Sequence, residues 1–210
     1  MASSIETTSS TTVLKNQGTA YISVDTDENV TLAHPLALAS GGTGAASAAA
    51  AAAAIAPIQL QTAVATTSGT TKDFTGIPAG VNKITVTYNG VSDNGSSVII
   101  AQLGTSGIVT SGYVATAVYI APSTSVTAVT AGFPMSNDAG AAAAMSGILH
   151  LVRHTGNEWV GTAMSNDETN TQVHYGVGKI ALAGEVDALR FTTVSAATFD
   201  AGSVNISWEF

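Results

Sequence analysis

The sequence has no cysteine and few charged or aromatic residues. Among its 210 residues, six Lys and Arg face fourteen Asp and Glu, a formal net charge of −8, and charged residues make up 10% of the chain. Without cysteine there are neither disulfides nor thiolate metal sites. The negative charge argues against a nucleic-acid partner, since phosphates attract basic surfaces. So few charges leave much of the surface poorly solvated, and we expect partner chains to cover part of it.

Long apolar runs are also lacking. The first residues, Met1 to Glu6, show no basic region followed by an apolar stretch, so we expect no secretory signal. The alanine run Ala48 to Ala54 is too short and too weakly apolar to span a bilayer, which takes about 20 apolar residues. We therefore expect no membrane insertion, and a protein made in a cytoplasm and then incorporated into a larger assembly.

A glycine-rich turn and the alanine run separate two segments of different character. Gly41-Gly42-Thr43-Gly44 is followed by alanines up to Ala54, and Pro57 ends the pattern. Alanine is the best helix former and proline stops a helix, so a short helix is predicted. Such a helix is marginal alone in water. Its small side chains favour close packing against other copies, so we expect 41–57 to be an oligomeric neck with contacts at Ala46, Ala50, Ala53 and Ala54.

Residues 1–40 are expected to form a small attachment segment. The Ser/Thr-rich residues 1–12 have no apolar face and should be flexible alone. Thr19 to Val24 and Val30 to Leu32 are typical of strands joined by a polar turn, so a β-hairpin is predicted. Because two strands alone are marginal, we expect the hairpin to pack on other chains or on a host particle.

The residues after Pro57 are dense in Thr, Val, Ile, Ser and Gly, with short alternating runs between turn signals, which predicts an antiparallel β-sandwich head over 58–210. Asn89-Gly90 and Asp93-Asn94-Gly95 are expected turns. In the last run, Val204, Ile206, Trp208 and Phe210 share one face, so that strand should be central to the core. The expected strands are Lys83 to Tyr88, Val98 to Leu103, Tyr113 to Ile120, Gly147 to Arg153, Glu158 to Ala163, Asp187 to Thr193 and Ser203 to Phe210.

One tetrapeptide occurs twice, as Met135-Ser136-Asn137-Asp138 and as Met164-Ser165-Asn166-Asp167. Chance is one explanation. The other is that both copies mark loops at the same end of the sandwich, where polar tips contact a ligand.

The sequence offers little for catalysis. His150 and His154 are too far apart on a straight strand to share one metal, since each residue rises about 3.3 Å, although rings of histidines around a trimer axis could bind one. Glu158, Asp167, Glu168 and Glu185 could supply a carboxylate pair for glycoside hydrolysis, but acidic residues in polar turns are ordinarily solvated. We expect no enzymatic activity, no cofactor and no bound metal.

Several segments together resemble a domain of bacteriophage tail-fibre and virion-fibre proteins. Residues 71–86 are similar to its opening, and 155–160 to its turn followed by a tryptophan strand. Residues 186–193 and 198–206 are similar to its last two strands, and Gly41 to Ala45 to a linker that commonly precedes it. The resemblance covers roughly the last two-thirds of the chain.

This resemblance implies a homotrimeric fibre of a virion assembled in a bacterial cytoplasm. The N-terminus would attach to other virion proteins, at the tail, the baseplate or the capsid. The C-terminal head would be a mainly β, jelly-roll-like sandwich. Two functions follow. The head is an adhesin for bacterial surface polysaccharide, with contacts at Tyr113, Asn137, Asp138, Trp159, Asn166, Asp167 and Tyr175. Alternatively, the protein is a capsid decoration, a head fibre or another structural virion protein that binds no receptor.

The neck can be tested by placing a charge on its expected axis. Ala50→Glu or Ala53→Glu should disrupt assembly more than a single charge placed on the head, because three like charges would meet at one axis. Light scattering of the full-length protein measures the molar mass. Assembly indistinguishable from that of the wild type would mean that the alanines are only a spacer.

Overall fold

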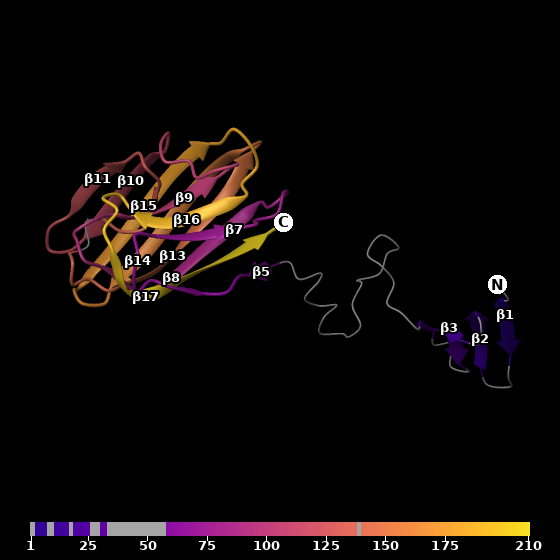
Figure 1. The fold of residues 1–210 in the computed structure, drawn as a ribbon. Coiled ribbons are helices and arrows are strands. Elements are labelled where there is room, and N and C mark those ends of the chain that lie inside the picture. Colours follow the sequence, from indigo (N-terminus) through magenta and orange to yellow (C-terminus); the bar gives the residue numbers. More distant parts are fainter. Residues whose placement is uncertain (1–2, 8–10, 17–18, 26–29, 33–57, 138–139) are drawn as a thin grey trace. The chain divides into compact units, whose positions relative to one another are not determined.

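The computed structural model describes residues 3–7, 11–16, 19–25, 30–32, 58–137 and 140–210 (Figure 1). The chain divides into two compact units, Met1–Pro57 and Ile58–Phe210. The described residues form antiparallel strands and contain no helix, so they hold no helix that could cross a membrane. The chain is mainly β, as its strand signals predict.

The N-terminal unit contains a four-stranded antiparallel sheet in sequence order, formed by β1 (Ser3–Thr7), β2 (Thr11–Asn16), β3 (Thr19–Asp25) and β4 (Val30–Leu32). β1 falls in the segment expected to be flexible alone. β3 and β4 occupy the residues of the expected hairpin, and β1 and β2 extend the pair to four strands. The role of this segment in attachment remains a prediction. The neck at 41–57, with Ala46, Ala50, Ala53 and Ala54, lies outside the described residues.

The C-terminal unit contains a large sheet and a small one. The small sheet has the order β12 (Phe133–Pro134), β9 (Ile99–Gly104), β16 (Ala188–Thr193) and β7 (Thr71–Thr75). The large sheet has the order β11 (Ser125–Val129), β10 (Val114–Ile120), β15 (Gln172–Ala181), β14 (Glu158–Asp167), β13 (Met145–Thr155), β8 (Lys83–Asp93), β17 (Phe199–Glu209) and β5 (Ile58–Leu60), with β6 (Val64–Ala65) also paired to β17.

The main hydrophobic core lies between these two sheets. Ile84 and Val86 of the large sheet belong to the same buried cluster as Leu103, Leu189 and Phe191 of the small sheet. The two layers thus pack face to face, as in a sandwich. With nine strands in one sheet and four in the other, they differ from the eight strands of a jelly roll. All residues of the two buried hydrophobic clusters belong to Ile58–Phe210, so this unit has a core of its own.

Two details of the expected strands are corrected. Asn89-Gly90 is not a hairpin turn: β8 continues through it to Asp93, and the pairing with β17 shifts register nearby, which indicates a β-bulge. In the last strand, Val204, Ile206 and Trp208 are buried as expected, but Phe210 is 63% exposed because β17 ends at Glu209.

Inward-facing glycines let β12 approach the large sheet closely. A Cβ atom added to Gly176 would lie 1.9 Å from the carbonyl oxygen of Pro134, and one added to Gly161 would lie 2.6 Å from the Phe133 ring. Glycine inside a strand is typical of such close backbone approaches. A side chain at these positions would push the two layers apart.

We predict that Gly176→Ala destabilises the protein by about 3 kcal/mol, the upper end of overpacking costs, because the clash is with backbone and not with a movable side chain. Chemical denaturation measures the change. Gly140→Ala is the matched control, since an added Cβ there meets nothing within 4 Å. Equal stability of the two variants would contradict the close-approach argument.

Candidate functional site

The large sheet exposes an apolar row on the side turned away from the core, which we call the outer face. Cross-strand pairing aligns Val126, Val118, Tyr175, Met164 and Ile148 on five adjacent strands. Val126 is 66% exposed, Met164 53% and Tyr175 41%. Surfaces of this kind mark interaction sites, because burying apolar area is favourable.

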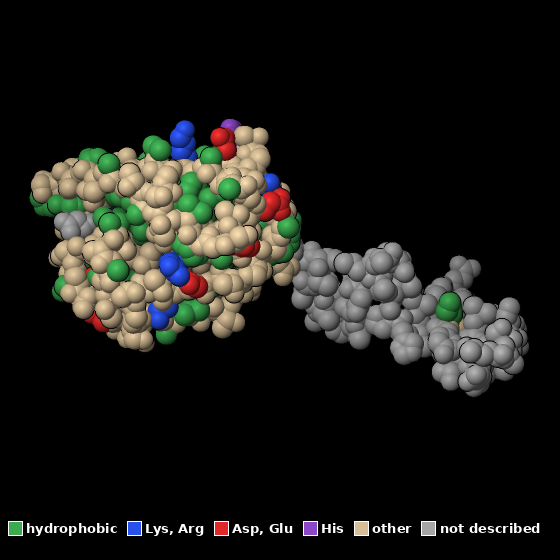
Figure 2. Space-filling view, turned by 45° about the horizontal axis from the view of Figure 1, so that its top comes forward, with side chains coloured by type: hydrophobic (Ala, Val, Ile, Leu, Met, Phe, Trp, Pro, Cys, Tyr) green, Lys and Arg blue, Asp and Glu red, His purple; other side chains and the backbone are tan. Residues whose placement is uncertain are grey.

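Further exposed apolar residues extend this row in both directions along the strands, and few charges interrupt them. On β10, β14 and β15 the charged residues of the outer face are Glu158 and Lys179, near one end. In Figure 2, charged side chains are few on the face in view, and some of them lie beside a side chain of opposite charge. The outer face can therefore contact another apolar surface without removing many charges from water. The additional exposed residues are Val114, Ile120, Val152, Val160, Val173 and Val177.

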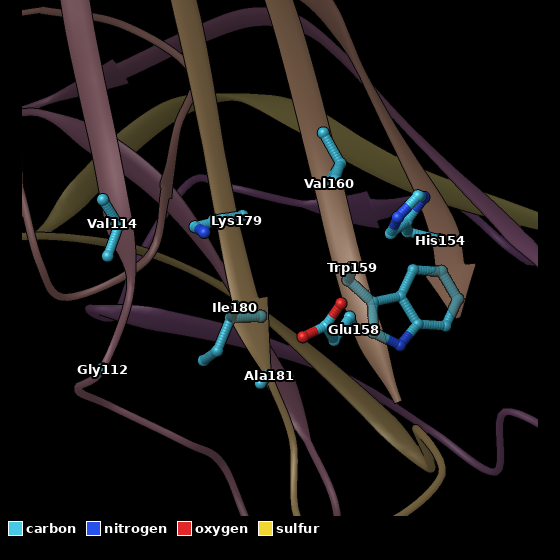
Figure 3. A pocket seen from close by; sticks show the side chains of 9 residues that line it. All are labelled: Gly112, Val114, His154, Glu158, Trp159, Val160, Lys179, Ile180 and Ala181. Atoms are coloured by element: carbon cyan, nitrogen blue, oxygen red, sulfur yellow. The ribbon is translucent and has the colours of Figure 1, made fainter. Parts of the chain in front are cut away.

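A pocket of about 510 Å³ lies at the charged end of the outer face. Figure 3 shows Val114, Lys179 and Val160 on three neighbouring strands, with Glu158 beside them. The titratable groups of its lining, His154, Glu158 and Lys179, are exposed and form no ion pair with one another. The described residues of the lining are Gly112, Val114, His154, Glu158, Trp159, Val160, Lys179, Ile180 and Ala181.

Two aromatic residues expected at a receptor surface are core residues. Tyr113 and Trp159 are each 2% exposed. The Leu103 N–H donates to the Tyr113 hydroxyl oxygen at 2.8 Å, and that hydroxyl donates to the Val109 carbonyl oxygen at 3.1 Å. Burial raises the pKa of Tyr113 to about 12, so the hydroxyl stays protonated. The expectation of surface contacts from these two side chains is wrong, because Trp159 occupies an inner-face position of β14 and Tyr113, which directly precedes β10, is also buried in the core.

Asp167 is also buried, and its carboxylate organises a turn. It accepts hydrogen bonds from the Thr169 and Asn170 backbone N–H groups at 2.9 and 3.2 Å, and from both of their side chains at 2.7 Å. Burial by itself would raise the pKa of Asp167, but these hydrogen bonds lower it below its usual range. Asp167 is therefore structural and not a receptor contact.

Of the other expected receptor residues, Asn166 and Tyr175 are exposed and Asn137 is buried. Asp138 lies outside the described residues. The exposed pair belongs to the outer face, on β14 and β15, and not to a loop tip.

The two copies of the repeated tetrapeptide meet in the structure. The Ser165 hydroxyl of the second copy donates to the Met135 carbonyl oxygen of the first at 2.8 Å, as does the Tyr88 hydroxyl. The second copy lies at the end of β14, and Met135, Ser136 and Asn137 are buried. The repeat thus ties the two sheets together at one end, which sequence alone did not reveal.

His174 is buried next to this junction. Its Nδ1 accepts a hydrogen bond from the Asn137 N–H at 3.0 Å, which places the proton of the neutral ring on Nε2. Nε2 has no hydrogen-bond partner among the described residues. Burial lowers the pKa of His174, while the nearby Asp167 carboxylate and the Asn137 hydrogen bond act in the opposite direction.

The described residues hold no group of three or more His, Asp or Glu placed to share a metal. Glu158 and Asp167 begin and end the ten-residue strand β14, so their Cα atoms are about 30 Å apart, too far for a glycosidase pair. Glu185 forms an ion pair with Arg153 at 3.2 Å, and Glu168 contacts the Ser146 hydroxyl. His150 lies 3.2 Å from the Thr85 hydroxyl, between Nδ1 and Oγ1.

Comparison of the chain with protein-family models, with curated proteins and with solved structures finds no match.

The outer face was not anticipated from the sequence, although β15 carries a usable signal. Apolar residues at 173, 175 and 177 alternate with His174, Gly176 and Gly178. Alternation normally assigns the apolar set to the core. Here the glycines face inward, because only they fit against Pro134 and Ala115, and the apolar set is left on the outside.

We predict that stability falls in mild acid because of His174. An unfolded histidine has a pKa near 6.5 and the native pKa is lower, so the unfolded chain binds a proton first as the pH drops. The contribution is fully present above pH 6.5 and is lost as the pH falls through the native pKa. Urea unfolding across this range measures it. His174→Gln should flatten that part of the profile, whereas His154→Gln, at an exposed site, should leave it unchanged; the reverse pattern would refute the assignment.

Proposed function

We propose that this chain is a structural fibre protein of a bacteriophage virion, a homotrimer with its N-terminal segment attached to the particle and its β-structured head directed outward. The observation that carries the proposal is the outer face, an uncharged apolar row across five strands. A protein displayed to water as a monomer would expose this row, while a fibre covers it with its own copies.

The outer face suits contact between identical copies. Its central row, from Val126 to Ile148, carries no charge, so bringing copies together opposes no like charges and removes none from water. The low overall charge of the chain agrees with such covered surfaces. A neck that holds three chains together would keep the heads at high local concentration, which favours even a weak contact.

The segments that resemble virion-fibre proteins coincide with ordered strands of the head. Residues 71–86 include β7 and the start of β8, and residues 155–160 form the turn between β13 and β14 together with the start of β14. Residues 186–193 include β16, and 198–206 include most of β17. Apart from the linker-like Gly41 to Ala45, the segments that carry the resemblance therefore lie on or next to strands of the two sheets.

Two roles for the outward head remain, adhesion to bacterial surface polysaccharide and a purely structural role at the tail or on the capsid. Burial of Tyr113 and Trp159 favours the structural role, because it removes two of the three aromatic side chains expected at a sugar site and leaves Tyr175. Binding of labelled full-length protein to bacterial cells separates the two.

The proposal predicts that the isolated head, residues 58–210, associates through the outer face. Met164→Glu should shift it toward monomer, because each contact would then bury an unpaired carboxylate. Sedimentation velocity measures the distribution, and Thr71→Glu, on the exposed side of β7, is the control. A wild-type head and full-length chain that are both monomeric at micromolar concentration would overturn the fibre proposal.

A further inference from the structure

The strands at the edges of the two sheets differ in how they are protected from pairing with another chain. An edge strand exposes unpaired backbone N–H and C=O groups, and proteins guard it with charges, with proline or by keeping it very short. β7 carries Lys72 and Asp73, and β12 has two residues, one of which is Pro134. β5 and β6 have three and two residues. Each of these four strands therefore has one of the usual protections.

β11, the edge strand at the other end of the large sheet, has none of them. Ser125–Val129 is five residues long, contains neither a charged residue nor proline, and pairs with β10 in unbroken register. No charged residue occurs between Asp93 and Asp138 in the sequence. Figure 1 shows β11 at the end of the sheet, beside β10. A regular, uncharged edge rich in β-branched residues is the kind that pairs with another strand.

The backbone groups of β11 that point away from β10 have few partners. Within the described part of the chain, β11 pairs with β10 alone, and no backbone hydrogen bond outside that ladder reaches it. Asn137 Nδ2 donates to the Ser125 carbonyl oxygen at 3.1 Å, at the first residue of the strand. No described residue forms a hydrogen bond with the outward backbone groups from Val126 to Val129, so these groups can pair with an added strand.

The sequence of β11 suits pairing with a second β11 in the antiparallel direction. A two-fold axis perpendicular to the sheet keeps the outer faces of both copies on one side, so outward residues must lie opposite outward residues. The longest register that meets this condition is centred on Thr127, which then lies opposite its own copy. Val126 lies opposite Ala128, and both are exposed. Threonine pairs and apolar pairs across strands are favourable, and the second copy continues the apolar row of the outer face.

We propose that β11 pairs with β11 of a second copy of this chain, so that two large sheets join edge to edge around a two-fold axis at Thr127. Such a contact uses the same edge on both copies and is complete with two of them, so it cannot close a trimer. It joins heads that belong to separate trimers, or two chains where no trimer exists. The inference therefore goes beyond the proposed fibre and does not depend on it.

The test is disulfide trapping in the full-length protein, which contains no cysteine of its own. Residues directly opposite in an antiparallel pair have Cα atoms about 4.5 to 5.5 Å apart, within the span of a disulfide. With oxidised glutathione, Thr127→Cys should give disulfide-linked dimers at least roughly tenfold faster than Thr130→Cys, because pairing raises the local thiol concentration. Thr130 is the matched control, an exposed threonine after β11 whose two copies would be about 20 Å apart in this register.

A charge at the same position gives a second, independent measurement. In Thr127→Lys two like charges would lie directly opposite each other, which is destabilising. Sedimentation velocity should therefore show a smaller associated fraction for Thr127→Lys than for Thr130→Lys. Urea unfolding of all four variants verifies that each is folded.

The outcomes separate this contact from the outer face. Fast trapping at position 127, with association reduced in Thr127→Lys, supports edge pairing. Equal trapping at positions 127 and 130, or no trapping at position 127 at high micromolar concentration, overturns it. Adding Met164→Glu to the Thr127→Cys chain should leave trapping unchanged, and trapping lost in that double variant would assign the contact to the outer face and also overturn edge pairing. An untrapped protein that still assembles retains the fibre without the edge contact, while trapped dimers that form no larger assembly retain the edge contact and remove the fibre.

Discussion

The close approach of β12 to the large sheet is the constraint on which the head depends. Phe133 and Pro134 pack where Gly161, Gly176 and Gly178 present no side chains, and the Pro134 carbonyl oxygen occupies the space that a Cβ of residue 176 would need. Because this small strand pairs with β9, its position also sets the distance between the two layers. The buried ring of Phe133, and the hydrogen bonds from the Tyr88 and Ser165 hydroxyls to the Met135 carbonyl oxygen, hold the two layers together at the same place.

That constraint determines what the opposite side of the large sheet exposes. Side chains alternate along a strand, so placing glycines and His174 inward on β15 leaves Val173, Tyr175 and Val177 outward. The neighbours of Tyr175 on β10 and β14 are Val118 and Met164, and Ile148 of β13 continues the row, which creates a face suited to other copies of the chain. The proposed trimer contact is in this sense a consequence of how tightly the two layers pack.

Next to this close approach of the two layers, the contacts are hydrogen bonds between buried polar groups and not apolar packing. Asn137 bridges His174 and Ser125, and its Oδ1 is buried without a hydrogen-bond partner among the described residues.

The alternating runs were enough to predict a mainly β head and most of its strands, because a half-buried strand needs apolar residues at every second position. The sequence does not predict β15, because the residues that face inward on this strand are mostly glycines and not large apolar side chains. It predicts a turn at Asn89-Gly90, because a β-bulge and a hairpin turn favour the same residue types. Composition alone indicated few charges and a need for covered surface. Only the tertiary structure decided which side of each strand is covered: it buried Tyr113, Trp159 and Asp167, turned the apolar set of β15 outward, and joined residues 135–137 to His174, since these contacts link segments far apart in the chain.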